Sequence, residues 1–131
     1  QDYSANFYIG ETSLYAGYYF GPYFGDFIKN PYLGADVFLF NRLSLGASVN
    51  FVNLADVKRT IINTRMDWKV FDKFYVRSYY QNDTYTNNQL WNSIFQYEFF
   101  AGSNVYLVFN LNGEKLQNTR KYFKVGYEFT L

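Results

Sequence analysis

Apolar and polar residues alternate at every second position along most of the chain, and this period restricts the fold more than any other feature. The alternation is cleanest at 43–51, where Leu43, Leu45 and Ala47 are separated by Ser44 and Gly46. Successive side chains of a β-strand point to opposite faces, so the pattern predicts strands with one apolar and one polar face. About nine segments follow it, namely 3–10, 14–23, 32–40, 43–51, 61–70, 74–81, 91–99, 104–111 and 122–131. The sequence therefore predicts an all-β, antiparallel up-and-down fold.

The composition excludes several classes of function. Aromatic residues make up 24% of the chain, which favours strands and membrane interfaces. Basic and acidic residues number 12 and 11, without the basic excess of a nucleic-acid-binding protein. Cysteine and histidine are both absent, which excludes disulfides, Cys/His metal sites and nucleophiles that rely on a histidine base. We therefore expect no cofactor, no metal and no nucleic-acid partner.

The alternation allows two arrangements of the faces. In a soluble up-and-down barrel the apolar face fills the interior and binds a hydrophobic ligand, as in lipocalins. In a transmembrane barrel the apolar face contacts lipid and the polar face lines the lumen. A mean hydropathy of −0.28 does not separate the two, because lipid-facing and lumen-facing residues cancel in the average.

Charged residues of the predicted strands fall on the polar face, while the apolar face carries none. We predict that they form a charged lumen network, which consists of Asp36, Arg65, Asp67, Lys69, Arg77, Glu98, Lys124 and Glu128. Two of these carboxylates could also pair as the acid and base of a glycosidase. A charged network explains the accompanying Arg and Lys residues as well, so we predict that the chain is not an enzyme.

The predicted connections alternate in length, and this favours the membrane arrangement. They are tight at 11–13, 41–42, 72–73 and 102–103, and longer and more polar at 25–30, 53–59, 82–89 and 112–118. Bacterial outer-membrane barrels have short periplasmic turns and longer extracellular loops. The apolar face also gathers aromatic residues near both strand ends, as expected for girdles at two bilayer interfaces.

The last predicted strand, 122–131, resembles the C-terminal targeting signal of outer-membrane barrels. That signal ends in a polar residue, a glycine and two apolar residues at fixed spacing, here Lys124, Gly126, Phe129 and Leu131. We therefore expect an outer-membrane location, contact with the lipid bilayer, and recognition of the last strand by the barrel-assembly machinery.

The number of strands leaves two solutions open, because single-chain bacterial barrels have an even number. Residues 14–131 would close an eight-stranded barrel if the first segment is not a membrane strand. Otherwise about nine strands form the C-terminal portion of a larger barrel. Residues 1–131 are predicted to belong to one domain in either case.

Several stretches resemble a known family. They are Tyr23-Phe24-Gly25-Asp26-Phe27, Leu43-Ser44-Leu45-Gly46, Phe95-Gln96-Tyr97-Glu98 and the run from Gly102 to Asn110. They are similar to the C-terminal end of a Bacteroidota outer-membrane family that pairs a family 9 carbohydrate-binding-module-like domain with a large barrel. The resemblance implies an outer-membrane location, possible partner chains, and glycan handling by a domain outside this chain. It favours the larger barrel.

Together these features predict a structural or transport-related outer-membrane barrel, with the soluble lipocalin-like barrel as the alternative. Tyrosines on the polar face could stack on a sugar or fill the lumen and bond their neighbours. They are Tyr15, Tyr19, Tyr75, Tyr79 and Tyr106.

Overall fold

The fold is a single sheet of nine strands. The computed structural model describes residues 1–101, 103–114 and 120–128, with side chains as far as residue 114 and again from residue 124. The strands are β1 (Asp2–Ile9), β2 (Thr12–Tyr23), β3 (Asp26–Leu39), β4 (Leu43–Leu54), β5 (Val57–Phe71), β6 (Phe74–Asp83), β7 (Asn88–Phe100), β8 (Ser103–Glu114) and β9 (Arg120–Glu128). In the described part of the chain, no helix is long and apolar enough to cross a membrane.

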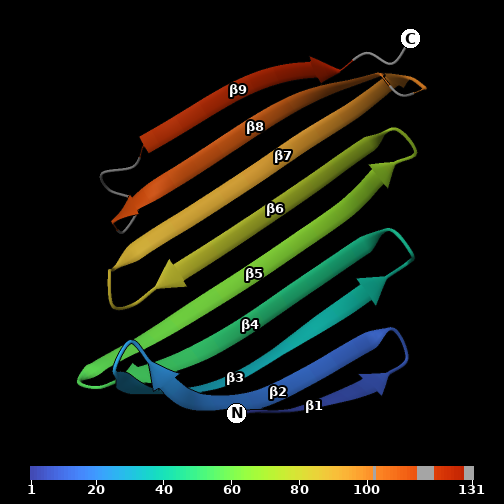
Figure 1. The fold of residues 1–131 in the computed structure, drawn as a ribbon. Coiled ribbons are helices and arrows are strands. Elements are labelled where there is room, and N and C mark those ends of the chain that lie inside the picture. Colours follow the sequence, from blue (N-terminus) through green and yellow to red (C-terminus); the bar gives the residue numbers. More distant parts are fainter. Residues whose placement is uncertain (102, 115–119, 129–131) are drawn as a thin grey trace.

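Each strand pairs antiparallel with the next strand in sequence, so the sheet runs in the order β1 to β9. Figure 1 shows a curved sheet of tilted strands, with β1 and β9 along its two opposite borders. Among the described residues, β1 and β9 make no contact with each other. The prediction of an all-β, antiparallel up-and-down fold with about nine strands is confirmed.

The eight-stranded closed barrel is not what the structure contains. β1 pairs with β2 along its whole length, from Asp2 opposite Tyr19 to Ile9 opposite Thr12. Within the described ranges, β2 and β9 are likewise not neighbours in the sheet. The first segment is therefore a strand of the same sheet. Its backbone pairs with β2 without a break, and its apolar residues lie on the same face as those of β2.

Two of the longer connections predicted from sequence are wrong. β2 and β3 stay paired as far as Tyr23 and Asp26 and turn through Phe24 and Gly25, which both have positive φ, as a two-residue hairpin turn requires. β4 and β5 stay paired as far as Leu54 and Val57. Polar residues at 26–30 and 53–59 thus continue strands, because ladder hydrogen bonds outweigh their low intrinsic strand preference.

Connection lengths consequently separate the two ends of the sheet less than predicted. The connection expected at 82–89 spans only 84–87 between β6 and β7. The one expected at 112–118 begins later, since β8 continues to Glu114, and the remainder lies outside the described residues. The three fully described turns at the opposite end, 10–11, 40–42 and 72–73, have two or three residues. The connections at 24–25 and 55–56 have two residues each, so the two ends hardly differ there.

Pro31 lies within β3 and locally interrupts the pairing of β3 with β4. Pairing between β3 and β4 is interrupted at Asn30 and Pro31 and resumes with Tyr32 opposite Asn50. Proline has no N–H to donate, so a strand that contains it loses a ladder hydrogen bond at that point. The register is unchanged on both sides of the gap because the alternation of faces is preserved.

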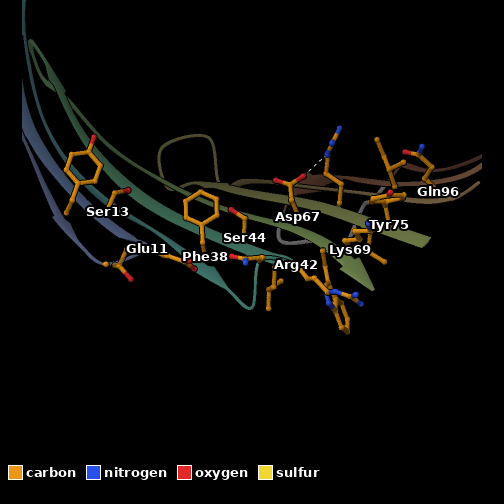
Figure 2. Close-up of a pocket in the computed structure, with 18 residues that line it drawn as sticks. Glu11, Ser13, Phe38, Arg42, Ser44, Asp67, Lys69, Tyr75 and Gln96 are labelled. Atoms are coloured by element: carbon orange, nitrogen blue, oxygen red, sulfur yellow. Dashed lines mark hydrogen bonds and ion pairs between the residues drawn. The ribbon is translucent and has the colours of Figure 1, made fainter. Parts of the chain in front are cut away.

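The two faces of the curved sheet differ in chemistry. Figure 2 shows Ser44, Asp67 and Gln96 rising from the concave side. The alternation along β4 then places Leu45 on the convex side, with 38% of its surface exposed. Other large exposed side chains of the convex face are Leu33, Phe51, Trp68, Trp91 and Tyr97.

The sheet has no apolar core in the described part of the chain, where no hydrophobic side chain is fully buried. The concave face is packed by tyrosines that lie over glycines of neighbouring strands. A methyl group at Gly17 would overlap the Tyr32 ring, and one at Gly34 would overlap the Tyr15 ring. Tyr32 faces Gly17 and Gly34 faces Tyr15 in the register of β2 and β3. Gly17 and Gly34 thus make room for tyrosine rings.

We predict that Gly34→Val is destabilising because the new side chain occupies the space of the Tyr15 ring. Overpacking of this kind costs about 1–3 kcal/mol. Tyr15→Ala removes the obstacle, so the double variant should lose less stability than the sum of the two single variants. Urea titrations followed by tryptophan fluorescence measure all three. Strict additivity would mean that the Tyr15 ring does not lie over Gly34.

Candidate functional site on the concave face

A chain of alternating charges crosses the middle of the concave face. Arg65 on β5 donates from Nη2 to Asp36 Oδ1 on β3 over 2.9 Å. These residues are separated by a whole strand, and Gly46 on β4 lies between them in the register. A methyl group at Gly46 would overlap the Asp36 carboxylate. The ion pair therefore depends on a glycine in the intervening strand.

Asp67 extends the same chain of charges towards β6. Its carboxylate accepts a hydrogen bond from Arg77 Nε at 2.6 Å and lies 3.9 Å from Arg65 Nε. The Arg77 and Arg65 side chains are 73% and 53% exposed, so water screens these pairs and each contributes at most about 1 kcal/mol to folding. The main effect of the array is the electrostatic potential that it sets over the concave face.

The remaining residues of the predicted network lie outside this array. Lys69 Nζ is 3.5 Å from Asp72 Oδ1 and 5.9 Å from the centre of the Tyr75 ring. Glu128 accepts a hydrogen bond from the Tyr106 hydroxyl at 3.3 Å. Glu98 lies opposite Asn104, and Lys124 lies opposite Val108 on the neighbouring strand. The role of all these residues in lining a lumen stays a prediction.

The predicted targeting signal is only partly described. Lys124 and Gly126 lie in β9, whereas Phe129 and Leu131 fall outside the described residues. Recognition of this signal by the assembly machinery also stays a prediction.

A hollow of about 710 Å³ opens beside the charge array, towards the strand ends that are joined by the turns at 10–11 and 40–42. Figure 2 shows Phe38, Ser44, Asp67 and Tyr75 around it. Phe38 is 49% exposed although it lies on the polar face. Ser44 and Asp67 follow Phe38 in the same register row, and the small Ser44 side chain leaves space between ring and carboxylate. Sequence analysis assigned Phe38 no role, although the alternation at 32–40 puts it on the same face as Asp36.

A second polar cluster, at the other end of the strands, was not predicted. Arg59 Nη2 lies 2.6 Å from Asp83 Oδ2, and Asp83 is only 4% exposed. Asp83 also accepts hydrogen bonds from the Tyr85 backbone N–H at 3.1 Å and the Thr86 hydroxyl at 2.8 Å. An aspartate that bonds the backbone two residues later is typical of turns. The run Asp83-Thr84-Tyr85-Thr86 carried that signal.

The tyrosines of the concave face bond to their neighbours. The Tyr79 hydroxyl lies 3.0 Å from Asn63 Oδ1 and 2.9 Å from Gln81 Oε1. The Tyr75 hydroxyl donates to the Asp72 carbonyl at 3.1 Å. These contacts fix the rings along the sheet. Bonding to neighbouring residues was one of the uses expected for these tyrosines.

The arrangement offers little for catalysis. Asp36 and Asp67, the carboxylates at the centre of the face, are both engaged by arginines. Across the described ranges, no group of three or more acidic side chains could hold a metal ion. The face is suited to contact polar solutes, with charges of both signs presented in a fixed order.

We predict that Asp83→Ala loosens the connection between β6 and β7. The variant loses the ion pair with Arg59 and the hydrogen bonds to Tyr85 and Thr86, which lowers stability by about 1 kcal/mol. Amide hydrogen exchange at Tyr85 should become faster. Asp72→Ala is the matched control, because Asp72 is 80% exposed and contacts its cations at 3.5–3.6 Å. Equal effects of the two variants would contradict the role given to Asp83.

No family model matches the chain, and no curated protein is significantly similar to it in sequence. One solved structure resembles it, described as "KdgM porin in complex with disordered oligogalacturonate". The two superpose with a TM-score of 0.55 at 14% identity, over 98% of this chain and 75% of that chain. The chain therefore has the fold of a porin-type β-barrel wall.

Proposed function

We propose that this chain forms part of the wall of an outer-membrane β-barrel, through which polar solutes cross. The observation that carries the proposal is the arrangement of the two faces. Large apolar side chains cover the convex face without being buried, while the ion pairs of Asp36, Arg65, Asp67 and Arg77 lie on the concave face. A transmembrane barrel has this arrangement, with lipid outside and polar groups inside.

Aromatic side chains of the convex face support a bilayer placement. Near one end of the strands, the register row of β5 to β9 consists of Phe71, Phe74, Tyr97, Val105 and Tyr127, which is aromatic at every strand except β8. Near the other end Phe20 has the Tyr3, Tyr18 and Phe27 rings at 5.8–6.1 Å. Aromatic rings of transmembrane barrels gather at both membrane interfaces. As described, strands β2 to β9 have 9–15 residues and β1 has 8, and about 9–11 residues suffice to cross a bilayer.

The soluble alternative, a lipocalin-like binder of hydrophobic ligands, requires the opposite arrangement. Its apolar face would have to line the concave side, where a ligand is enclosed. Here that side carries the charges, and Leu33, Leu45 and Trp68 face outward with 38–53% exposure. Such a surface in water would be far larger than the apolar patches that monomeric soluble proteins tolerate.

Saccharides are the solute class that we propose. The similar porin was solved with an oligogalacturonate, an oligosaccharide that carries carboxylates. On the concave face of this chain, the exposed Phe38 ring lies beside the Asp67–Arg77 ion pair and Gln96 in one hollow. An aromatic ring suits the C–H face of a sugar and the polar groups suit its hydroxyls. Membership of the Bacteroidota family, a linked glycan-binding domain, partner chains and delivery by the assembly machinery remain proposals.

We predict that Val49→Arg and Ser48→Arg have unequal effects in the complete native protein. Val49 lies on the convex face and would expose a charge to lipid, which costs about 2–4 kcal/mol near the bilayer centre. Ser48 lies on the concave face, where the same charge is hydrated. The measurements are recovery in the membrane fraction and heat-modifiable gel mobility. Equal tolerance, or a native protein that stays aqueous without detergent, would refute the membrane placement.

We also predict that the channel conducts and that its ion selectivity depends on the charge array. Native protein in planar bilayers should raise the conductance, and the Asp36→Asn, Asp67→Asn variant should lower the cation-to-anion permeability ratio by roughly twofold or more. The control variant Asp56→Asn, Asp72→Asn also removes two negative charges, from the turns after β4 and β5, and should change the ratio less. Liposome swelling with oligosaccharides tests the solute class. Inserted protein without conductance would indicate a filled, purely structural barrel.

A further inference from the structure

The two border strands of the sheet determine how a barrel made from this chain can close. Among the described residues, β1 pairs as a strand only with β2, and β9 only with β8. About half of the backbone N–H and C=O groups of a border strand point away from its single partner. Water can satisfy such groups at a soluble edge. In the hydrocarbon region of a bilayer it cannot, and open sheet edges do not occur there.

Strand direction excludes closure of β1 directly onto β9. All eight neighbouring pairs are antiparallel. In a sheet of nine alternating strands, the first and the last therefore point the same way. A seam between β1 and β9 would be parallel, which breaks the pattern of every other pair and of single-chain bacterial barrels.

Strand direction also excludes closure by identical copies. Copies in one membrane are related by an axis along the membrane normal, so all of them keep the same orientation across the bilayer. β9 of one copy would then meet β1 of the next copy with both strands pointing the same way. Any number of copies meets this obstacle at every seam.

We infer that the barrel is completed by an odd number of further antiparallel strands, supplied by polypeptide outside residues 1–131 and inserted between β9 and β1. An odd number restores the alternation of directions at both seams and makes the total even. These strands must carry apolar residues at every second position, since they continue the lipid-facing surface. The superposed porin fits this inference, because a quarter of its chain lies outside the match. The inference depends on the proposed membrane placement.

Photocrosslinking in the complete native protein, within its own membrane, tests the inference. The photoreactive residue p-benzoylphenylalanine is placed at Phe7 on β1 or at Tyr127 on β9, where it replaces an aromatic side chain of the convex face. Tyr97 is the control, because Phe74 and Val105 flank it on β6 and β8. Adducts are identified by peptide mass spectrometry, and mixed isotope-labelled and unlabelled cells distinguish crosslinks between copies.

The expected result is that Tyr97 captures only β6 and β8 peptides. Phe7 and Tyr127 should each capture, besides β2 and β8 respectively, a peptide from outside residues 1–131 with alternating apolar residues. Adducts that join β1 to β9, in one copy or between copies, would overturn the inference. It would also fail if both border probes capture nothing beyond β2 and β8 while the control reacts. Recovery of the protein in the aqueous fraction would instead refute the membrane placement.

Discussion

Hydrogen bonding between adjacent antiparallel strands is the interaction on which the rest of the structure depends. The described chain has no buried apolar side chain that could act as a core, so the ladders and the side-chain contacts across them hold the sheet together. Within the described ranges, each interior strand pairs on both sides, whereas β1 and β9 each pair on one side. The proposal that further strands complete a membrane barrel rests on the same requirement, that backbone N–H and C=O groups away from water be hydrogen-bonded.

The second constraint is space on the concave face, where curvature brings side chains together. Glycines provide this space at defined register positions. Gly17 and Gly34 accommodate tyrosine rings, and Gly46 lets the Asp36 carboxylate reach Arg65 across a strand. The tyrosine packing and the charge array thus have the same cause. A glycine on one strand leaves space for a large or charged side chain of the neighbouring strand. The electrostatics of a proposed lumen would follow from that packing.

The sequence predicted the fold class well and, over the middle of the strands, the separation of charged from apolar residues, because period-two alternation is a local property of each strand. The separation does not extend to the strand ends, where Lys29 lies opposite Phe20 and Lys58 opposite Asn53 on the convex face. It predicted strand ends poorly. Asp26 and Lys29 lie in β3, and Lys58 and Arg59 lie in β5, although such polar clusters are typical of loops. The hairpins continue there because each partner strand provides backbone N–H and C=O groups for hydrogen bonding. The strand propensity of a single residue does not include this contribution. The Arg59–Asp83 pair was missed for the same reason, since it joins residues whose proximity follows from the register of β5 and β6.

By itself, the sequence determined that the chain forms antiparallel strands whose middle parts have one charged and one apolar face, since each residue's face follows from its position in the alternation. Tertiary structure alone decided which face is concave, which of the charged residues meet, and that the borders stay apart. Those properties depend on sheet curvature and on register across several strands. Asp36 and Arg65 illustrate the difference: the sequence assigned both to the polar face, but only the register of β3, β4 and β5 brought them to 2.9 Å across Gly46.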